Sequence, residues 1–412
     1  MMKTNIPTLI LKPGKERALL RRHPWVYSTG VASVKGKPQS GDTIKIVDNK
    51  GNFLAWGAYS PESALRARCW SFNENDVIDE AWIRARVFEA IRSRDNLKDR
   101  TNAIRLIFGE ADFLPGLIVD QYDTQLVTQF QAAGVEKWRP EIGKALTDAT
   151  GFTQVYDRSD AATRAREGLP ERKEVLEGEE PPEKIQIIED GILYGVDVRM
   201  GHKTGFYVDQ RDNRRLARQL AENFRKVHGR GMRALNCFCY TGGFSLALSK
   251  GGADEVISID SSADALEMAQ SNAKLNGFSE SQMKWVEANV FEQLRKYRDA
   301  GEKFDLVILD PPKFASSHHH VEKAARAYKD INLNGLRLLN EGGQLLTFSC
   351  SGAIDVDLFQ KIVAGAVFDA KTDAWMISRL CAGSDHPLLM THPEGEYLKG
   401  LHLVSRGANT AG

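Results

Sequence analysis

Two segments of the sequence end in residues that could hold a cofactor. An apolar run ends in Thr241-Gly242-Gly243, and the glycine pair would let the backbone approach a ligand closely where the next helix begins. The following apolar run ends in Asp260, whose carboxylate could accept hydrogen bonds from both ribose hydroxyls of a nucleoside cofactor. The glycines lack the G-x-G-x-x-G spacing of a nicotinamide or flavin site, which argues against a dehydrogenase.

Two further segments contain residues that could act on a substrate. In Asp310-Pro311-Pro312-Lys313-Phe314 the prolines would stiffen the backbone after an apolar run, and Phe314 supplies a ring on which a base could stack. Residues 342–352 have a buried-strand pattern that delivers Cys350 to the end of the strand. Most free cysteines are small buried hydrophobic residues. A thiol beyond a strand end can act as a nucleophile when its neighbours lower its pKa.

These segments meet only if they end neighbouring parallel strands. From residue 192 onward, apolar runs alternate with segments of helical periodicity, which is typical of a mainly parallel sheet with helices on both faces. The predicted strands are 233–237, 255–259, 284–286, 305–309 and 343–348, and the predicted helices are 244–250, 263–275 and 323–339. We therefore predict a Rossmann-like domain over residues 189–412. Asp260 and Asp310 would mark a site at the carboxyl edge of its sheet, which favours Cys350 as a nucleophile there.

Residues 1–188 have a different pattern. Short strands are predicted at 8–11, 25–27, 43–47 and 53–59, with turns rich in glycine between them. This spacing indicates a small barrel over residues 1–73. Residues 74–188 mix helical periodicity with apolar alternation, which predicts an intermediate α/β domain.

Charge distinguishes the N-terminal segment from the rest of the chain. The 412 residues contain 55 Lys and Arg and 55 Asp and Glu, so the formal net charge is zero. The first 72 residues hold twelve basic and four acidic side chains, and the remainder is correspondingly acidic. A small basic module on an acidic body suggests docking to a polyanion, although a merely solvated basic face would have the same composition.

Other classes of protein find little support. No stretch reaches the ~18 consecutive apolar residues of a membrane span, and the first residues lack the apolar core of a signal peptide, so we expect a cytoplasmic protein. The five cysteines lack paired zinc-type spacing. His318-His319-His320 is interpreted as a polar loop rather than a metal site, and Cys237 and Cys239 as packing residues.

Several segments in combination resemble one known family. They are residues 23–27 (HPWVY), 203–211 (KTGFYVDQR), 310–314 (DPPKF), 348–352 (FSCSG) and 393–400 (PEGEYLKG). Over essentially its whole length the sequence resembles the class I S-adenosylmethionine-dependent RNA methyltransferases that make 5-methylcytidine in bacterial large-subunit ribosomal RNA. The resemblance implies an N-terminal PUA domain, which is a small RNA-binding barrel, then an intermediate α/β domain and a class I methyltransferase domain. It also implies S-adenosylmethionine as cofactor, 23S ribosomal RNA, naked or in an assembling subunit, as partner, and no metal.

The resemblance also implies roles for single residues. Thr241 and Gly242 would approach the methionine part of the cofactor. Asp260 would hold its ribose, and Phe206 would help to cover it. Asn289 stands where the family usually has Asp, but its side-chain oxygen can still accept a hydrogen bond from the adenine amino group. Further contacts are implied for Asp310 with the cofactor and for Pro311, Lys313 and Phe314 with the substrate.

The implied chemistry overcomes the inertness of cytosine C5. Addition of the Cys350 thiolate at C6 would push electron density onto C5, which could then attack a sulfonium methyl group. Asp310 could hold or protonate the base at N3. Related RNA cytosine methyltransferases often carry another cysteine after the fourth strand to assist release, whereas this chain has Pro-Pro-Lys there. The base that removes the C5 proton and the release step are therefore unassigned.

Two alternatives stay open on sequence grounds. A D/N-P-P-aromatic motif also suits N-methylation of a guanine or adenine, which needs no cysteine. A catalytically silent RNA-binding or ribosome-assembly factor would tolerate loss of Cys350 and Asp310, although the intact cofactor motifs argue against it.

Overall fold

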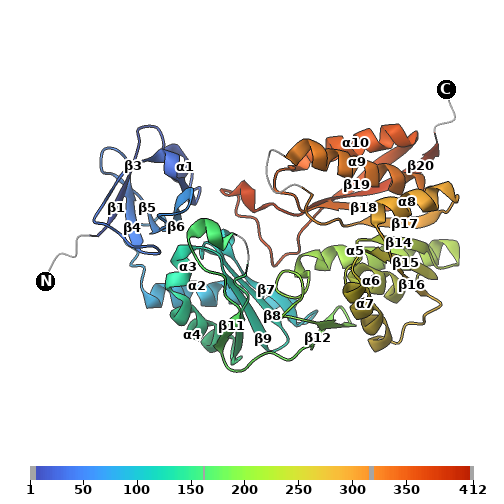
Figure 1. Ribbon diagram of the computed structural model, residues 1–412, viewed down its shortest axis with the longest axis horizontal. Coiled ribbons are helices and arrows are strands. Elements are labelled where there is room, and N and C mark those ends of the chain that lie inside the picture. The colour runs from blue at the N-terminus through green and yellow to red at the C-terminus, as the bar shows by residue number, and fades with distance from the viewer. Residues whose placement is uncertain (1–5, 161–162, 315–319, 409–412) are drawn as a thin grey trace. The chain divides into compact units, whose positions relative to one another are not determined.

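The computed structural model describes residues 6–160, 163–314 and 320–408, which divide into two compact units (Figure 1). The first unit comprises Met1–Ile188, Val196–Val208 and Asp385–Gly395. The second comprises Glu189–Gly195, Asp209–Ser384 and Glu396–Gly412. A two-stranded ribbon of β12 (Ile185–Glu189) and β13 (Ile192–Val196) lies where the chain first passes between them. No helix in the described ranges has both the length and the apolar character needed to cross a membrane.

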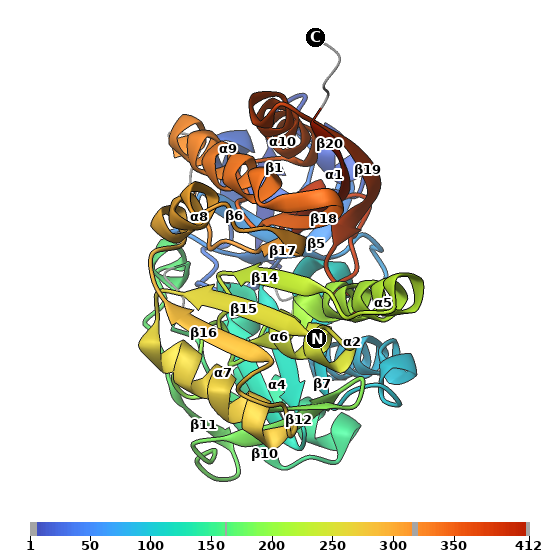
Figure 2. The same ribbon diagram turned by 90° about the vertical axis from the view of Figure 1, so that its right-hand side faces the viewer.

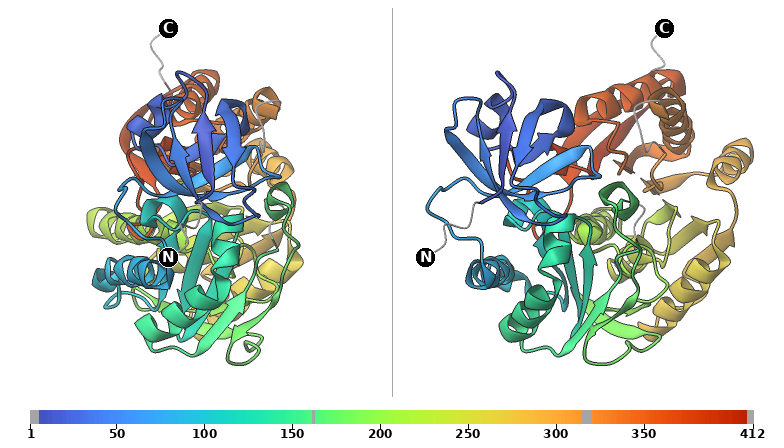
Figure 3. Two further views of the ribbon diagram at one scale, coloured as in Figure 1. Left: turned by 90° about the vertical axis from the view of Figure 1, so that its left-hand side faces the viewer. Right: turned by 60° about the vertical axis from the view of Figure 1, so that its left-hand side comes forward.

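The first unit begins with a six-stranded sheet, drawn in blue in Figure 3, with the strand order β2-β6-β5-β4-β1-β3. The elements are β1 (Thr8–Leu11), α1 (Arg17–Leu20), β2 (Trp25–Tyr27), β3 (Val31–Lys35), β4 (Thr43–Val47), β5 (Phe53–Tyr59) and β6 (Leu65–Ser71). Leu9, Ile44 and Ile46 point into its core because side chains alternate between the two faces of a strand. The four strands predicted from the sequence here are confirmed with the same bounds.

A second, five-stranded sheet in the same unit has the order β11-β10-β9-β8-β7. Its strands are β7 (Ala103–Phe108), β8 (Leu117–Tyr122), β9 (Gln125–Phe130), β10 (Gln154–Asp157) and β11 (Glu174–Glu177), and the helices are α2 (Glu80–Arg92), α3 (Ala133–Lys137) and α4 (Arg139–Thr150). Ile83 and Val87 of α2 share one apolar cluster with Ile142 and Leu146 of α4 and with strand residues. This spacing of three or four residues gives each helix one apolar face toward the sheet.

The second unit contains a seven-stranded sheet in the order β16-β15-β14-β17-β18-β20-β19 (Figure 2). The strands are β14 (Arg233–Cys237), β15 (Glu255–Asp260), β16 (Met283–Glu287), β17 (Phe304–Leu309), β18 (Leu339–Ser349), β19 (Thr372–Cys381) and β20 (Lys399–Ala408). Strands β14 to β18 pair in parallel, whereas β20 runs antiparallel to both β18 and β19. The predicted mainly parallel sheet is confirmed.

Helices cover both faces of this sheet. They are α5 (Arg211–His228), α6 (Gly243–Lys250), α7 (Ala263–Leu275), α8 (Val290–Asp299), α9 (Val321–Arg337) and α10 (Val356–Ala370). In β17, Leu306 and Ile308 pack with residues of α5 and α6, whereas Val307 and Leu309 pack with residues of α8, α9 and α10. The central strands are therefore buried on both faces, which explains their nearly continuous apolar sequence.

The strand order reverses at β14. The chain runs outward from β14 through β15 to β16 and then returns to form β17 on the other side of β14. Open α/β sheets bind ligands outside the carboxyl ends of the strands at such a point. The loops that follow β14 and β17 are therefore the natural places for a binding site.

Helix α8, which follows β16, begins with an asparagine cap. Asn289 Oδ1 accepts hydrogen bonds from the backbone N–H groups of Phe291 (3.0 Å) and Glu292 (3.4 Å). These N–H groups lie in the first turn, where no helical carbonyl is available to accept them. The side chain thus stabilises the start of the helix.

We predict that Asn289→Ala lowers the free energy of unfolding by about 1 kcal/mol, because two N–H groups lose their acceptor. Asn289→Asp should keep most of this stability, since aspartate caps helices equally well. Urea unfolding monitored by circular dichroism measures both. Lys296→Ala, an exposed change on the same helix, is the matched control. Equal stability of the wild type and Asn289→Ala would contradict the capping role.

Candidate active site

The loop between β14 and α6 has an unusual backbone. Phe238, Tyr240 and Gly242 have φ angles of 59°, 48° and 84°, in the left-handed region that other residues than glycine seldom adopt. Gly242 is also crowded, because a Cβ there would lie 2.9 Å from Trp285 and 3.0 Å from Leu246. Such conformations persist where surrounding contacts fix them, and they cluster at ligand sites. The glycine turn is therefore a rigid loop with little room for a larger residue.

Asp260, at the end of β15, fastens this loop. Its Oδ2 accepts a hydrogen bond from the Tyr240 N–H (2.8 Å), and its Oδ1 accepts one from the Ser262 N–H (3.0 Å). Each carboxylate oxygen has a second lone pair, so the same group can also accept from ribose hydroxyls. Buried Thr241 is held as well, since its carbonyl accepts from Asn272 Nδ2 at 3.2 Å. Sequence reasoning missed the role of Asp260 in holding the loop.

Two other residues predicted to contact the cofactor have local partners of their own. Both donors to Asn289 Oδ1 belong to α8, so adenine would have to share that oxygen. Phe206 lies in the first unit and is 3% exposed. Its N–H and its carbonyl lie 3.2 and 3.3 Å from the Tyr122 hydroxyl. Contacts of Asn289 and Phe206 with the cofactor stay predictions.

The turn after β17 carries the DPPKF motif. Asp310 is half-buried, Pro311 is buried and Lys313 is exposed. The ring of Phe314 is half-buried, with its centroid 4.8 Å from that of Tyr328, and it packs on the apolar cluster beneath α8, α9 and α10. Packing therefore gives the aromatic residue a structural role, and stacking of Phe314 on a substrate base stays a prediction.

Cys350 comes directly after β18, next to that turn. Its side chain is half-buried, and Sγ lies 4.0 Å from the carbonyl oxygen of Pro311. The two segments meet because β17 and β18 are parallel neighbours, with Leu309 opposite Thr347. The structure thus brings the DPPKF motif and the cysteine together, although they are about forty residues apart in the sequence.

The other four cysteines, Cys69, Cys237, Cys239 and Cys381, are less suited to nucleophilic chemistry. The first three are buried, and burial raises the pKa of each thiol. Cys381 is exposed, but partial burial of its thiol and two nearby carboxylates raise its pKa as well. A raised pKa leaves little thiolate at neutral pH, and the thiolate is the nucleophile.

A buried lysine underlies the segment that follows Cys350. Lys399, the first residue of β20, is 4% exposed, and its Nζ donates hydrogen bonds to the carbonyl oxygens of Ser351 (2.9 Å) and Ile354 (2.7 Å). The hydroxyl of buried Tyr328 lies 2.9 Å from Ser351 Oγ. The sequence analysis included Lys399 in segment 393–400 but assigned it no role, although a lysine at the start of the apolar alternation KGLHLV was a visible signal.

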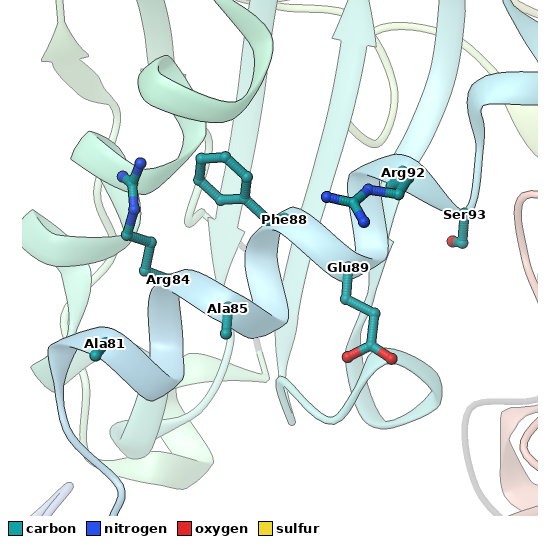
Figure 4. A pocket seen from close by; sticks show the side chains of 7 residues that line it. All are labelled: Ala81, Arg84, Ala85, Phe88, Glu89, Arg92 and Ser93. Carbon is teal, nitrogen blue, oxygen red and sulfur yellow. The ribbon is translucent and has the colours of Figure 1, made fainter.

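Other candidate sites do not involve these residues. A groove of about 740 Å³ runs along α2 and is lined by Ala81, Arg84, Ala85, Phe88, Glu89, Arg92 and Ser93 (Figure 4). None of the residues predicted from the sequence to bind the cofactor, bind the substrate or act in catalysis lines this groove. Within the described ranges, no group of three or more His, Cys, Asp or Glu could hold a metal ion. His320 is exposed, and His318 and His319 lie outside the described residues.

The ends of four adjacent strands thus provide two kinds of chemistry. The strained glycine loop after β14 and the carboxylate after β15 suit a nucleoside cofactor. The carboxyl group after β17 suits proton transfer, and the half-buried thiol after β18 suits covalent catalysis.

Comparison with known proteins shows which family the chain belongs to. Residues 125–380 match the family described as S-adenosylmethionine-dependent methyltransferase, and residues 9–72 match a PUA-like domain. A Klebsiella pneumoniae (strain 342) protein named ribosomal RNA large subunit methyltransferase I is 46% identical over 97% of this chain and 98% of its own length. An Escherichia coli (strain SMS-3-5) protein of the same name is 46% identical over 95% of this chain and 98% of its own length.

Solved structures have the same fold. A Streptococcus mutans protein described as a SAM-dependent methyltransferase superposes with a TM-score of 0.81 at 21% identity, covering 96% of this chain and 99% of its own. A methyltransferase structure complexed with SAH gives a TM-score of 0.83 at 22% identity with the same coverage. The α/β fold with an N-terminal PUA-like domain is therefore confirmed. The chain belongs to the S-adenosylmethionine-dependent methyltransferase family, among relatives named ribosomal RNA large subunit methyltransferase I.

Proposed function

We propose that this protein transfers a methyl group from S-adenosylmethionine to C5 of a cytidine in large-subunit ribosomal RNA, with Cys350 as the nucleophile. The observation that carries the proposal is the half-buried thiol of Cys350, 4.0 Å from the carbonyl of Pro311 at the carboxyl edge of the sheet. Family membership supports the methyl donor. The names of the relatives support ribosomal RNA as the substrate class.

The residues at this edge fit the cofactor. Asp260 offers carboxylate lone pairs for the ribose, and glycine at position 242 has only backbone atoms next to Thr241, so that a cofactor could approach the chain closely there. We assign Thr241, Gly242 and Asp260 to cofactor binding, with further contacts from Asn289 and Phe206. When bound, S-adenosylmethionine supplies an electrophilic methyl group on a sulfonium.

The chain's own groups activate the cytosine. The Cys350 thiolate adds to C6, which forms a C–S bond and moves the ring's π electrons toward C5. Asp310 holds or protonates N3 and so stabilises the electron-rich adduct. C5 uses this electron pair to form its bond to the methyl carbon, whose bond to the sulfonium sulfur would break with its electrons staying on sulfur, so that a neutral thioether is the leaving group. Loss of the C5 proton to a base then restores the C5–C6 double bond and expels sulfur with the electrons of its bond to C6, so that the Cys350 thiolate is regenerated.

The PUA-like domain would hold the RNA. Its basic residues gather around α1, where Lys12, Lys15, Arg17, Arg21 and Arg22 are all exposed. Such side chains bind phosphates and release counterions, which adds affinity without sequence specificity. We assign base contacts to Pro311, Lys313 and Phe314. The proposed partner is 23S ribosomal RNA, naked or in an assembling subunit, which places the enzyme in the cytoplasm.

We predict that Cys350→Ala abolishes transfer of tritiated methyl groups to large-subunit RNA but leaves cofactor binding unchanged, because only a thiol is lost. Cys381→Ala, which removes an exposed thiol of raised pKa, should keep wild-type activity and serves as the matched control. Mass spectrometry of the nucleosides should show 5-methylcytidine. Methylation by the Cys350→Ala variant at a comparable rate, or an N-methylated purine as product, would contradict the proposal.

We predict that Asp260→Ala weakens S-adenosylmethionine binding tenfold to a hundredfold, since loss of a hydrogen bond to a charged group costs roughly 1.5–3 kcal/mol. Isothermal titration calorimetry measures the affinity directly. Asp264→Ala, an exposed change in the first turn of α7, is the control and should bind like the wild type. Unchanged affinity in Asp260→Ala would rule out its assignment to the ribose.

A further inference from the structure

Lys399 is a buried cation at a position where the sheet would accept an apolar residue. It is the first residue of β20, it pairs with Ser349 of β18, and only 4% of it is exposed. Burial of a charged amine is costly unless hydrogen bonds or opposite charges compensate for the lost water. The free-energy cost of burying the Lys399 amine indicates that this residue does more than fill the core.

In the described residues, the side chain of Lys399 forms its hydrogen bonds with the segment after Cys350. Its Nζ donates to the carbonyl oxygens of Ser351 (2.9 Å) and Ile354 (2.7 Å). In the part of the chain that the structure describes, no carboxylate forms an ion pair with it. The two carbonyls are four residues or fewer from the thiol, so the ammonium fixes the backbone that presents Cys350.

The side chains of Lys399 and Cys350 also interact through their charges. Burial lowers the pKa of the Lys399 ammonium, while negative charge on Cys350, Glu396 and Asp355 acts in the opposite direction. Electrostatic interaction is mutual, so an ammonium that the thiolate stabilises also stabilises the thiolate. Two further titratable groups among the described residues interact with the pair. They are Lys313 on the turn after β17, whose charge lowers the pKa of Lys399, and Tyr328 on α9, where burial raises the pKa of the hydroxyl.

We propose that Lys399 is a positioning residue that fixes the loop carrying Cys350 and favours the thiolate form of Cys350 through its charge. The inference rests on the proposed function in one respect, that Cys350 needs to be a thiolate in order to add to C6. Nothing in it depends on which base or which RNA is methylated.

The test is the rate at which iodoacetamide alkylates Cys350 in the full chain between pH 5 and 10, quantified by peptide mass. The wild-type rate should follow an apparent pKa below the roughly 8.5 of a free cysteine. Lys399→Gln can still donate a hydrogen bond but has no charge, and it should react about tenfold more slowly at pH 7, which corresponds to about one pKa unit. Lys399→Arg should recover most of the rate. Lys361→Gln, on exposed α10 surface, is the control and should match the wild type.

Several results would overturn the proposal. One is an apparent pKa of wild-type Cys350 at or above that of a free cysteine. Another is a pH profile of alkylation in folded Lys399→Gln that matches the wild type. A third is an alkylation rate in Lys399→Arg as low as that in Lys399→Gln. If Lys399→Gln does not fold, the wild-type profile and the arginine variant still decide the matter. The assay needs neither RNA nor methyl transfer. Methylation by Cys350→Ala would therefore refute the proposed function while leaving the titration of the thiol intact, and an ordinary thiol pKa would refute the role of Lys399 alone.

Discussion

The parallel pairing of β17 with β14 on one side and β18 on the other is the constraint on which the site depends. Parallel strands that are neighbours end at the same edge, so the glycine loop, Asp310 and Cys350 follow three adjacent strands. Pairing of β14 with β15 adds Asp260. The buried, alternating side chains of β17 secure this register, because a slip by one residue would exchange the residues that face the two helical layers.

Polar side chains at this edge of the sheet form hydrogen bonds with the backbone of the loops that carry the candidate site residues. Asp260 accepts backbone hydrogen bonds from the loops after β14 and β15, and Lys399 donates to two carbonyls after β18. A buried polar group needs such partners, since leaving it unpaired costs more than an average hydrogen bond contributes. These hydrogen bonds fix the carboxylate of Asp260 and the backbone segment after Cys350 in the absence of a ligand.

Much of the fold was predictable because its strands have strong local patterns. The strands at 8–11, 43–47 and 233–237 were predicted with the bounds that the structure has. Strand β18 was predicted too short, since residues 339–342 have no apolar pattern and join the sheet through the pairing of Leu339 with Phe304. Strands β19 and β20 were missed. In β19 exposed Trp375 and Ile377 break the alternation that marks a half-buried strand.

The site was predictable only where residue type indicates chemistry. Asp260, Asp310 and Cys350 could be proposed because carboxylates and a thiol at strand ends suit this reaction. Three other features could not be predicted, because each depends on partners that the sequence pattern does not identify. They are the capping by Asn289, the packing of Phe314 and the contacts of Lys399. Lys399 is 49 positions from Cys350, and only the antiparallel pairing of β20 with β18 brings it beneath that loop.

The proposed function depends above all on a covalent bond between Cys350 and cytosine during methyl transfer. RNA that carries 5-fluorocytosine tests it most directly, because fluorine cannot leave C5 as a proton does, and the enzyme cannot complete the release step. With S-adenosylmethionine present, the wild-type protein should form a stable adduct whose peptide mass maps to Cys350, and Cys350→Ala should form none. Absence of an adduct with active wild-type enzyme, or an adduct on Cys237, Cys239 or Cys381, would contradict the account.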